Sequence, residues 1–442
     1  MAEELCGQMQ VVVLMGGLGT RLEGQTKTCP KPLLKVCERP FFEYQLDLLR
    51  MAGFRKFLFC VGYRSEMIEK YFGDGSRFGV EITYSYDGET LLGTGGAVRN
   101  ALPVLEKNFL LIYGDSFMDI NYFEVVVRYL QGLQAGKKAL MTVMRNNNRF
   151  DKSNVVCKDG EILLYDKKSG GSDMDYIDYG VSVFSRELFE AYPPGEAFDL
   201  SALQNHLSKQ KAIACCEVEQ RFYEIGTPSS LQEFTNYVQK RWGIPNKAVF
   251  LDRDGVINEI VWNEDIEQLD SPLKREQFRL LPGTLEALKT MQKKGYLLFV
   301  VTNQPAAAKG KTSYAELCAI NHTFIQHMRE RGIEIASLEM CPHFEHGNPR
   351  TKELYLIQTC DCRKPKTGLI RHITEKYNID MKNSWMAGDS FTDVVCGRTA
   401  GLHTAFIGKY KCDLCMMLEC NRPDMVCSNL KKFAEELPDA QG

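Results

Sequence analysis

Two aspartates separated by one residue follow an apolar run in the segment KAVFLDRDGV, residues 247–256. A carboxylate at a strand end can attack phosphorus to give an aspartyl-phosphate, and a neighbouring carboxylate can protonate the leaving oxygen and then activate water. We therefore interpret Asp252 as the nucleophile and Asp254 as the general acid and base of a phosphoryl transfer. An aspartate pair alone is weak support, since surface loops are rich in aspartate.

Three later segments strengthen this interpretation, because each falls at the end of a predicted strand or the start of a helix, where α/β sites form. VVTNQ offers Thr302 and Asn303 as phosphate and substrate contacts, and CRKP offers Lys364 to hold the transferring phosphoryl group. GDSFTD offers Asp389 for Mg²⁺ and Asp393 to support the site.

A glycine-rich loop near the start of the chain carries a second phosphate chemistry. GGLGTRL, residues 16–22, follows an apolar run directly. Its glycines let the backbone approach phosphates closely, while amide N–H groups and Arg21 supply positive charge. The spacing matches neither the dinucleotide fingerprint nor the P-loop, and alone it also fits a tight strand-to-helix turn. CPKPLLKV follows it and places Lys31 between two prolines.

Thiols and an imidazole between VVTNQ and CRKP form two close pairs separated by a loop: Cys341, His343, Cys360 and Cys362. Ligands at such spacing can complete a closed tetrahedral site, so we predict a structural Zn²⁺. His346 lies nearby and is interpreted as a surface residue. Whether a further group with a CxxC start binds metal stays open, because its last member falls in an ordinary late strand: Cys412, Cys415, Cys420 and Cys427.

Strand and helix patterns alternate in both halves of the chain, which predicts two parallel-sheet α/β units. Strands are expected over residues 9–17, 56–63 and 109–115 with a helix over 41–53, and in the second half strands over 296–304 and 384–390 with helices over 283–295 and 367–379. Between Asp252 and Thr302 only residues 261–278 remain as a loop, so no cap domain fits there. GIPN, residues 243–246, has the glycine and proline of a boundary, and the predicted domains are residues 1–243 and 244–442.

The bulk composition excludes several classes of protein. A net charge of −3 and a pI of about 6.2 give no basic footprint for nucleic acid or an anionic membrane. The N-terminus lacks a secretory signal pattern, and no apolar run is long enough to span a bilayer, so we expect a cytoplasmic protein. The 16 cysteines are then reduced thiols, some of them metal ligands.

The pairing of GGLGTRL with the PKP segment resembles the sugar nucleotidyltransferases, which make nucleotide sugars from a nucleoside triphosphate and a sugar 1-phosphate. The resemblance covers about residues 10–240 and implies that the triphosphate contacts Gly16, Gly17, Gly19, Thr20 and Arg21. It also implies that Lys31 neutralises charge on the α-phosphate, and that the base and sugar lie against LLGTGGAV, at Gly93, Thr94, Gly95 and Gly96.

The same resemblance implies the sugar and metal contacts. Lys167 would bind the sugar phosphate, with Asp178 and Gly180 near the sugar hydroxyls. Asp115 and Glu224 would hold Mg²⁺, although the family more often has aspartate at the second position.

The ordered set from Asp252 to Asp393 resembles the haloacid dehalogenase (HAD) phosphatases over about residues 247–430, which implies Mg²⁺ at Asp252, Asp254 and Asp389. CPH followed by CxCRKP is similar to the zinc-containing, cap-less subgroup that removes the 7-phosphate of D-glycero-D-manno-heptose 1,7-bisphosphate, with histidinol-phosphate phosphatases as relatives. One departure concerns TNQPAAAKG, in which Lys309 takes the substrate position where the subgroup commonly has arginine.

Together the resemblances imply an α/β fold with two Rossmann-like parallel-sheet domains: an N-terminal nucleotidyltransferase fold, similar to the heptose 1-phosphate guanylyltransferases, and a C-terminal cap-less HAD fold with a zinc loop. The implied function is bifunctional, because dephosphorylating a heptose 1,7-bisphosphate yields the 1-phosphate that a nucleotidyltransferase consumes.

The alternative is a cytidylyltransferase for another phosphorylated sugar or polyol, fused to a phosphatase of a different step. A further hypothesis is that one domain only senses nucleotide sugar. It is disfavoured because each domain has the full set of charged residues that catalysis would need. The base, the anomer, the oligomeric state (a homo-oligomer is compatible) and channelling stay open.

Overall fold

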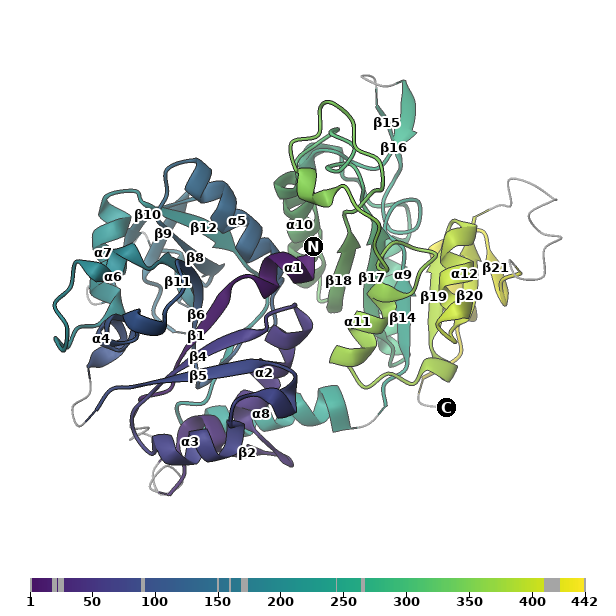
Figure 1. Cartoon of the computed structure of the whole chain (residues 1–442). Coiled ribbons are helices and arrows are strands. Elements are labelled where there is room, and N and C mark those ends of the chain that lie inside the picture. The colour runs from purple at the N-terminus through teal and green to yellow at the C-terminus, as the bar shows by residue number, and fades with distance from the viewer. Residues whose placement is uncertain are drawn as a thin grey trace. The chain divides into compact units, whose positions relative to one another are not determined.

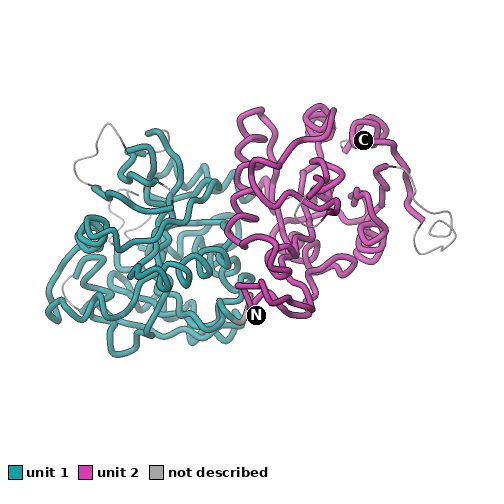
Figure 2. Tube along the Cα trace, turned by 90° about the horizontal axis from the view of Figure 1, so that it is seen from above, with its two compact units in different colours: residues 1–238 teal, residues 239–442 magenta. Residues whose placement is uncertain are grey.

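A computed structural model of the chain describes residues 2–17, 22, 28–88, 92–148, 151–158, 160–167, 174–243, 245–263, 267–408 and 422–440 (Figure 1). The chain divides into two compact units, Met1–Val238 and Gln239–Gly442 (Figure 2). The π-helical turn η4 (Gln239–Gly243) belongs to unit 2, where the guanidinium of Arg241 lies 4.0 Å from the centroid of the Tyr377 ring. Within the described residues, every helix is too short or too polar to cross a bilayer.

Unit 1 is built on a nine-stranded sheet. In spatial order the strands are β5 (Glu81–Tyr86), β4 (Lys56–Val61), β1 (Gln10–Leu14), β6 (Asn108–Tyr113), β11 (Tyr176–Ser185), β8 (Ala139–Arg145), β12 (Ile213–Glu217), β10 (Glu161–Tyr165) and β9 (Val155–Lys158). The first four are parallel, and α2 (Phe41–Met51), α3 (Ser65–Phe72) and α4 (Gly93–Asn100) supply the crossovers that parallel neighbours require. The predicted strands and helix of this half are confirmed, and the sheet is mixed because β11 runs antiparallel to β6 and β8.

Alternation along β1 builds the two apolar layers of unit 1, since successive side chains of a strand point to opposite faces. Val11 and Val13 pack with α2, α3 and α5 (Tyr122–Gln134), whereas Val12 packs with α4, α6 (Glu187–Glu190) and α7 (Leu200–Lys209). All three valines are fully buried, and each contributes on the order of 1.5 kcal/mol. Shorter elements complete the unit: α1 (Ala2–Gly7), η1 (Lys31–Leu33), β2 (Lys35–Val36), β3 (Arg39–Pro40), η2 (Ser76–Phe78), η3 (Leu102–Val104), β7 (Ser116–Phe117), β13 (Tyr223–Glu224) and α8 (Pro228–Val238).

Unit 2 has a six-stranded parallel sheet in the order β18 (Ile335–Cys341), β17 (Leu297–Asn303), β14 (Ala248–Leu251), β19 (Trp385–Gly388), β20 (His403–Ile407) and β21 (Met425–Cys427). Val249 and Leu251 face α9 (Thr284–Lys293), α10 (Tyr314–Glu330) and α14 (Leu430–Glu436). Ala248 and Phe250 face α11 (Gly368–Lys376) and α12 (Phe391–Thr399) on the other side. The strands and helices predicted for this half are confirmed, and Cys427 ends the edge strand β21. Three short 3₁₀ turns complete the unit: η5 (Arg275–Gln277), η6 (Leu354–Leu356) and η7 (Met381–Asn383).

A hairpin replaces part of the loop expected between Asp252 and β17. Strands β15 (Val261–Asn263) and β16 (Gln268–Asp270) pair so that Trp262 lies opposite Leu269. The expectation of a loop was wrong here, because valine and tryptophan favour extended backbone and gain a cross-strand partner. An ion pair of 2.5 Å between Lys311 and Asp270 ties the hairpin to the segment after β17.

Candidate active sites

The carboxyl ends of adjacent parallel strands bring the predicted groups of unit 2 together. Asp252 follows β14, Thr302 lies near the end of β17, and Asp389 follows β19. The ammonium of Lys364 lies 2.8 Å from Asp252 Oδ1 and 2.7 Å from Asp393 Oδ1, and it donates to the carbonyl of Val301 at 2.8 Å. A cation held by three acceptors has a fixed position, so this edge presents one positive charge beside the predicted nucleophile.

Three carboxylates at this edge fit a hard divalent cation. One oxygen each of Asp252, Asp389 and Asp393 lies within 4.8 Å of the others, and carboxylate oxygens are the ligands that Mg²⁺ prefers. Gly255 has φ +81°, and a Cβ there would stand 2.3 Å from Asp389 Oδ2, so this position requires glycine. Asp254, predicted as a further metal carboxylate, is not in this group.

Asp254 is instead held by neutral and cationic donors. The fully buried Arg253 lies 3.1 Å from Asp254 Oδ1 through one Nη and donates through the other to Asn321 Oδ1 at 2.7 Å. Asn258 donates to Asp254 Oδ1 at 2.9 Å, and the Gln304 amide donates to Oδ2. The carboxylate therefore has a fixed orientation, as a general acid and base needs.

Burial and neighbouring charges at this edge shift the pKa values of Asp252 and Lys364. Burial raises the pKa of Asp252 to about 7, and the charge of Lys364 opposes that rise. Burial disfavours the charged form of Lys364, but the carboxylates of Asp252 and Asp393 outweigh it and raise its pKa. Lys364 consequently remains an ammonium at neutral pH.

The other predicted contacts of unit 2 have distinct surroundings. Thr302 is buried, and its Oγ1 accepts from the Gln304 amide at 2.9 Å. The Asn303 side chain holds the backbone of Lys364, accepting from its N–H at 3.0 Å and donating to its carbonyl at 3.1 Å. The ammonium of Lys309 lies 4.3 Å from the centroid of the Phe344 ring.

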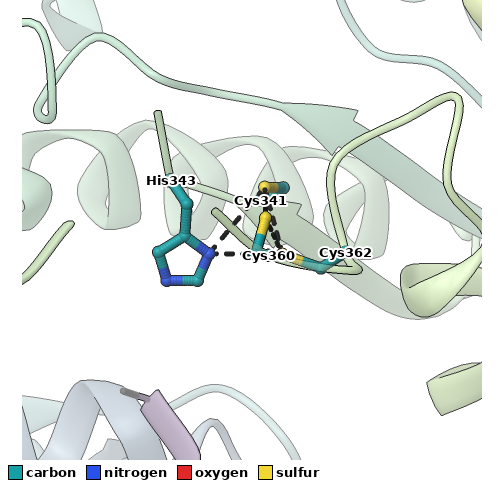
Figure 3. Close-up of side chains that lie close together, drawn as sticks. All are labelled: Cys341, His343, Cys360 and Cys362. Atoms are coloured by element: carbon teal, nitrogen blue, oxygen red, sulfur yellow. Dashed lines mark hydrogen bonds between the residues drawn. The ribbon is translucent and has the colours of Figure 1, made fainter. Parts of the chain in front are cut away.

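The predicted zinc ligands converge (Figure 3). Their three sulfurs lie 3.1 to 3.6 Å apart, and His343 Nδ1 lies 3.2 Å from Cys362 Sγ. A tetrahedral site with Zn–S bonds of about 2.3 Å requires a similar separation. None of the three cysteines is in a disulfide, and hydrogen bonds with Cys341 and Cys362 lower the pKa of Cys360, which favours a thiolate. Cys341 and His343 are buried, as in a closed structural site, so the group fits Zn²⁺.

The carboxyl edge of the unit 1 sheet holds a cavity of about 210 Å³. Predicted residues that line it are Gly16, Gly17, Lys31, Gly93, Thr94 and Asp115. The ammonium of Lys31 lies 2.8 Å from Asp115 Oδ2. Gly95 and Gly96 instead pack against residues 196–198. A Cβ on either glycine would collide with that segment, so both positions require glycine. Gly19, Thr20 and Arg21 lie outside the described residues, as do Cys412, Cys415 and Cys420.

Comparison with known proteins gives the family. Residues 10–241 match the Nucleotidyl transferase family model. The D-glycero-alpha-D-manno-heptose 1-phosphate guanylyltransferase of Campylobacter jejuni is 30% identical over 233 residues, which cover 51% of this chain and 98% of the relative. The chain belongs to the nucleotidyl transferase family.

The second unit of this nucleotidyl transferase has relatives of its own. Residues 361–433 match a HAD-hydrolase-like model. The D-glycero-beta-D-manno-heptose-1,7-bisphosphate 7-phosphatase of Vibrio cholerae is 37% identical over 163 residues, which cover 36% of this chain and 80% of the relative. An alpha-specific counterpart from Photorhabdus laumondii is 32% identical over 163 residues, or 37% of this chain and 82% of the relative. The chain is thus a fusion of a nucleotidyl transferase unit with a HAD-like phosphatase unit.

Two short strands of the nucleotidyl transferase unit bring the backbone of Glu224 beside that of Asp115. β13 pairs with β7 so that Glu224 lies opposite Ser116, the residue after Asp115. The carbonyl of Asp115 accepts from the N–H of Ile225 at 3.0 Å.

The predicted sugar contacts lie on and beside β11. Asp178 is partly buried, and burial raises its pKa while the N–H of Gly180 and the charge of the exposed Lys167 oppose that rise. Gly180 has φ +92°, in the region that favours glycine, and a Cβ there would stand 3.8 Å from Tyr113, which lines the cavity. Gly180 therefore lies beside the cavity of unit 1, and its N–H donates to Asp178 Oδ1 at 3.0 Å.

Several candidate residues were missed in the sequence. Gln304 ends the VVTNQ run, and Arg253 separates the two aspartates, so both lie inside motifs that had already been recognised. The burial of an arginine between two acids, however, has no sequence pattern that would predict it. Asp87 directly follows β5 and Asn258 lies in the turn beyond Asp254, and neither belongs to a motif. Asp87 lines the nucleotidyl transferase cavity.

Proposed function

We propose that this chain performs two consecutive steps of nucleotide-sugar biosynthesis. Residues 244–442 would remove the 7-phosphate of a heptose 1,7-bisphosphate, and residues 1–243 would transfer a nucleotidyl group to the resulting heptose 1-phosphate with release of pyrophosphate. The observation that carries the proposal is the presence of two separate sites for phosphate chemistry, with Lys364 between Asp252 and Asp393 in one unit and Lys31 beside Asp115 in the other.

The phosphatase step follows from the positions of the two aspartates. An oxygen of Asp252 attacks phosphorus, the bond from phosphorus to the sugar oxygen breaks, and that oxygen takes the proton of Asp254. Asp254 then removes a proton from water as the water attacks the aspartyl-phosphate, which releases inorganic phosphate and restores Asp252. Asp252 and Asp389 would hold Mg²⁺, which would supply charge neutralisation for the phosphoryl oxygens. Lys364 adds a second positive charge, and Asp393 and Asn303 position it.

The transfer step needs no covalent intermediate. An oxygen of the sugar 1-phosphate attacks the α-phosphorus in line, and the bond to the β-phosphate oxygen breaks. Lys31 and Arg21 neutralise the developing charge, with Mg²⁺ on Asp115 and Glu224 supplying the remainder. Lys167, Asp178 and Gly180 would hold the sugar phosphate and hydroxyls.

Two cations beside Phe344 in the phosphatase unit support the proposal of a bisphosphate substrate. Lys309 Nζ lies 4.3 Å and Arg363 Cζ lies 5.3 Å from the same Phe344 ring. Burial and the charges of Lys311 and Arg363 lower the pKa of Lys309, so the structure gathers like charges there. The phosphate that is not transferred would bind this pair.

The names of the relatives guide the choice of substrate. The matched transferase relative is a guanylyltransferase for an α-anomer, and matched phosphatases include α- and β-specific enzymes. A phosphatase that supplies the transferase on the same chain must release the anomer that the transferase uses. We therefore propose GTP and the α-anomer, a structural Zn²⁺ in the phosphatase unit, and a cytoplasmic location, where nucleoside triphosphates are available.

Two single substitutions test the assignment of steps to sites. Asp252→Asn should abolish phosphate release from the bisphosphate and leave transfer to supplied heptose 1-phosphate intact, whereas Asp115→Asn should do the reverse. Mass spectrometry of reactions with one nucleoside triphosphate at a time measures both products. Loss of both activities in either folded variant would refute two independent sites, and light scattering on the same samples gives the oligomeric state.

A further inference from the structure

Asp87 presents its carboxylate to the cavity of unit 1. It follows β5 directly, it is partly buried, and it lines the cavity that contains Lys31 and Asp115. Among the residues that the structure describes, none donates a hydrogen bond to its carboxylate or forms an ion pair with it. A desolvated carboxylate without a partner costs stability, so a ligand that satisfies it is the simplest reason for its presence.

The strand order places Asp87 and Asp115 after different strands of the same sheet edge. The strands run β5, β4, β1, β6, with Asp87 after β5 and Asp115 after β6. Neighbouring strands lie about 4.8 Å apart, so roughly 14 Å of sheet edge separates the backbone at the ends of β5 and β6, but the Asp87 side chain reaches back across the end of β4 toward β1. Asp87 Oδ2 lies 3.0 Å from where a Cβ of Gly16 would stand and 3.4 Å from that of Gly62, so the carboxylate extends over the glycine floor.

Charge decides which part of a nucleotide can meet this carboxylate. A triphosphate is repelled by this carboxylate and is attracted to Lys31, so Asp87 is better placed to meet the nucleoside. Guanine offers two adjacent donors, N1–H and the N2 amino group. Uracil offers one N–H between two carbonyls, while adenine and cytosine place a ring acceptor beside their amino groups.

We infer that Asp87 selects guanine in the nucleotidyl donor by accepting hydrogen bonds from N1–H and the N2 amino group. The inference rests on the proposed transferase function and adds the residue that sets its base specificity. The contact is bidentate, which makes it sensitive to the group at C2 of the purine.

Three purine triphosphates test the inference on the wild-type protein and on Asp87→Asn. Inosine triphosphate lacks the C2 amino group, and xanthosine triphosphate has a carbonyl there. The wild type should prefer GTP over both, by about 5- to 150-fold in kcat/KM, the range that one bidentate base contact supplies. Asparagine can accept from N1–H and donate to a C2 carbonyl, so Asp87→Asn should reverse the preference in favour of xanthosine triphosphate. Dissociation constants for the three nucleotides should change in the same order.

Glu81→Gln, an exposed change at the other end of β5, is the matched control and should keep the wild-type preference. An equal fall for all three nucleotides in Asp87→Asn would indicate a ribose contact or a damaged fold and would overturn the inference. So would a wild type that does not distinguish GTP from inosine triphosphate, a measurement that needs no variant. If the wild type makes a nucleotide sugar from a pyrimidine triphosphate instead, the transferase function stands and the inference falls. If no triphosphate reacts or binds, the proposed transferase function itself has failed.

Discussion

The ammonium of Lys31 lies 2.8 Å from Asp115 Oδ2, so the cation predicted for the triphosphate and the carboxylate predicted for Mg²⁺ contact each other directly. Their side chains are 11% and 26% exposed, which limits solvent screening of the pair. Lys31 is the first residue of η1 and directly follows Pro30. The proline ring fixes the backbone there, so the ammonium of Lys31 is held near the end of β6. The pair therefore defines the position in which charge on the α-phosphate and the metal would be balanced.

Lys31→Met should lower kcat for nucleotidyl transfer by about 100- to 1000-fold, because it removes one preorganised charge from the transition state. Phosphate release by the other unit should not change. Coupled assays for pyrophosphate and for inorganic phosphate measure the two steps in one sample.

Lys35→Met is the control, since Lys35 is exposed on β2 four residues along the same segment. It should keep both activities. A Lys31→Met protein with normal transfer would remove Lys31 from the proposed chemistry.

Arg253→Met should destabilise the phosphatase unit by about 3–5 kcal/mol, because Arg253 is fully buried and its loss leaves the carboxylate of Asp254 without a cationic partner. The chain's tryptophans are Trp242, Trp262 and Trp385, all in unit 2, so tryptophan emission during urea unfolding follows that unit within the intact chain.

The exposed ion pair between Arg371 and Asp361 provides the comparison. Arg371→Met removes an arginine from the same unit and should cost only about 0–1 kcal/mol, as surface pairs do. Equal costs for the two variants would contradict the importance of the buried pair.

The sequence predicted side chains that meet at the carboxyl edge of each sheet, but not the groups that orient them. Asp252, Lys364 and Asp389 were predictable because strand ends and motif order bring them to one edge, and the convergence of Cys341, His343, Cys360 and Cys362 because close thiol and imidazole pairs have few other uses. Arg253 and Gln304 act through tertiary contacts with Asp254, which no local pattern reveals. The role of Asn303 in holding Lys364, and the pairing of Trp262 with Leu269, depend on three-dimensional placement in the same way.

Cys360→Ser should abolish stoichiometric zinc binding and lower both the stability of the phosphatase unit and its activity, while transfer to supplied sugar 1-phosphate persists. The physical reason is that the loop carrying Cys362 also carries Lys364, so an unsupported loop releases the catalytic ammonium. Metal analysis of the purified chain gives the stoichiometry, and tryptophan emission gives the stability.

Cys318→Ser changes a buried thiol of α10 outside the cluster and should retain zinc. Full phosphatase activity in a zinc-free Cys360→Ser protein would show that the metal has no part in positioning Lys364.

Asp87→Asn should raise the melting temperature of the transferase unit above pH 6, although it removes the proposed guanine contact. Burial raises the pKa of Asp87 to about 6, above the ordinary value of 3.8, so the folded state binds this proton more tightly than the unfolded state. The wild type therefore bears the cost of a desolvated carboxylate above pH 6, and that cost fades as the pH falls through 6 toward 4. Asparagine carries no charge at any pH, so the advantage of the variant should be a few degrees at pH 7.5 and should shrink on acidification.

Differential scanning calorimetry of the full chain measures this advantage, with the unit 2 transition assigned by tryptophan emission. The neighbouring Cys60 thiol does not confuse the profile, because burial and the charge of Asp87 raise its pKa well above this range. Glu81→Gln should show no comparable advantage, since Glu81 is exposed. A variant that melts lower than the wild type at pH 7.5, or an advantage that is the same at pH 7.5 and pH 4.5, would mean that Asp87 has a stabilising partner in the folded protein and is not held unpaired for a ligand.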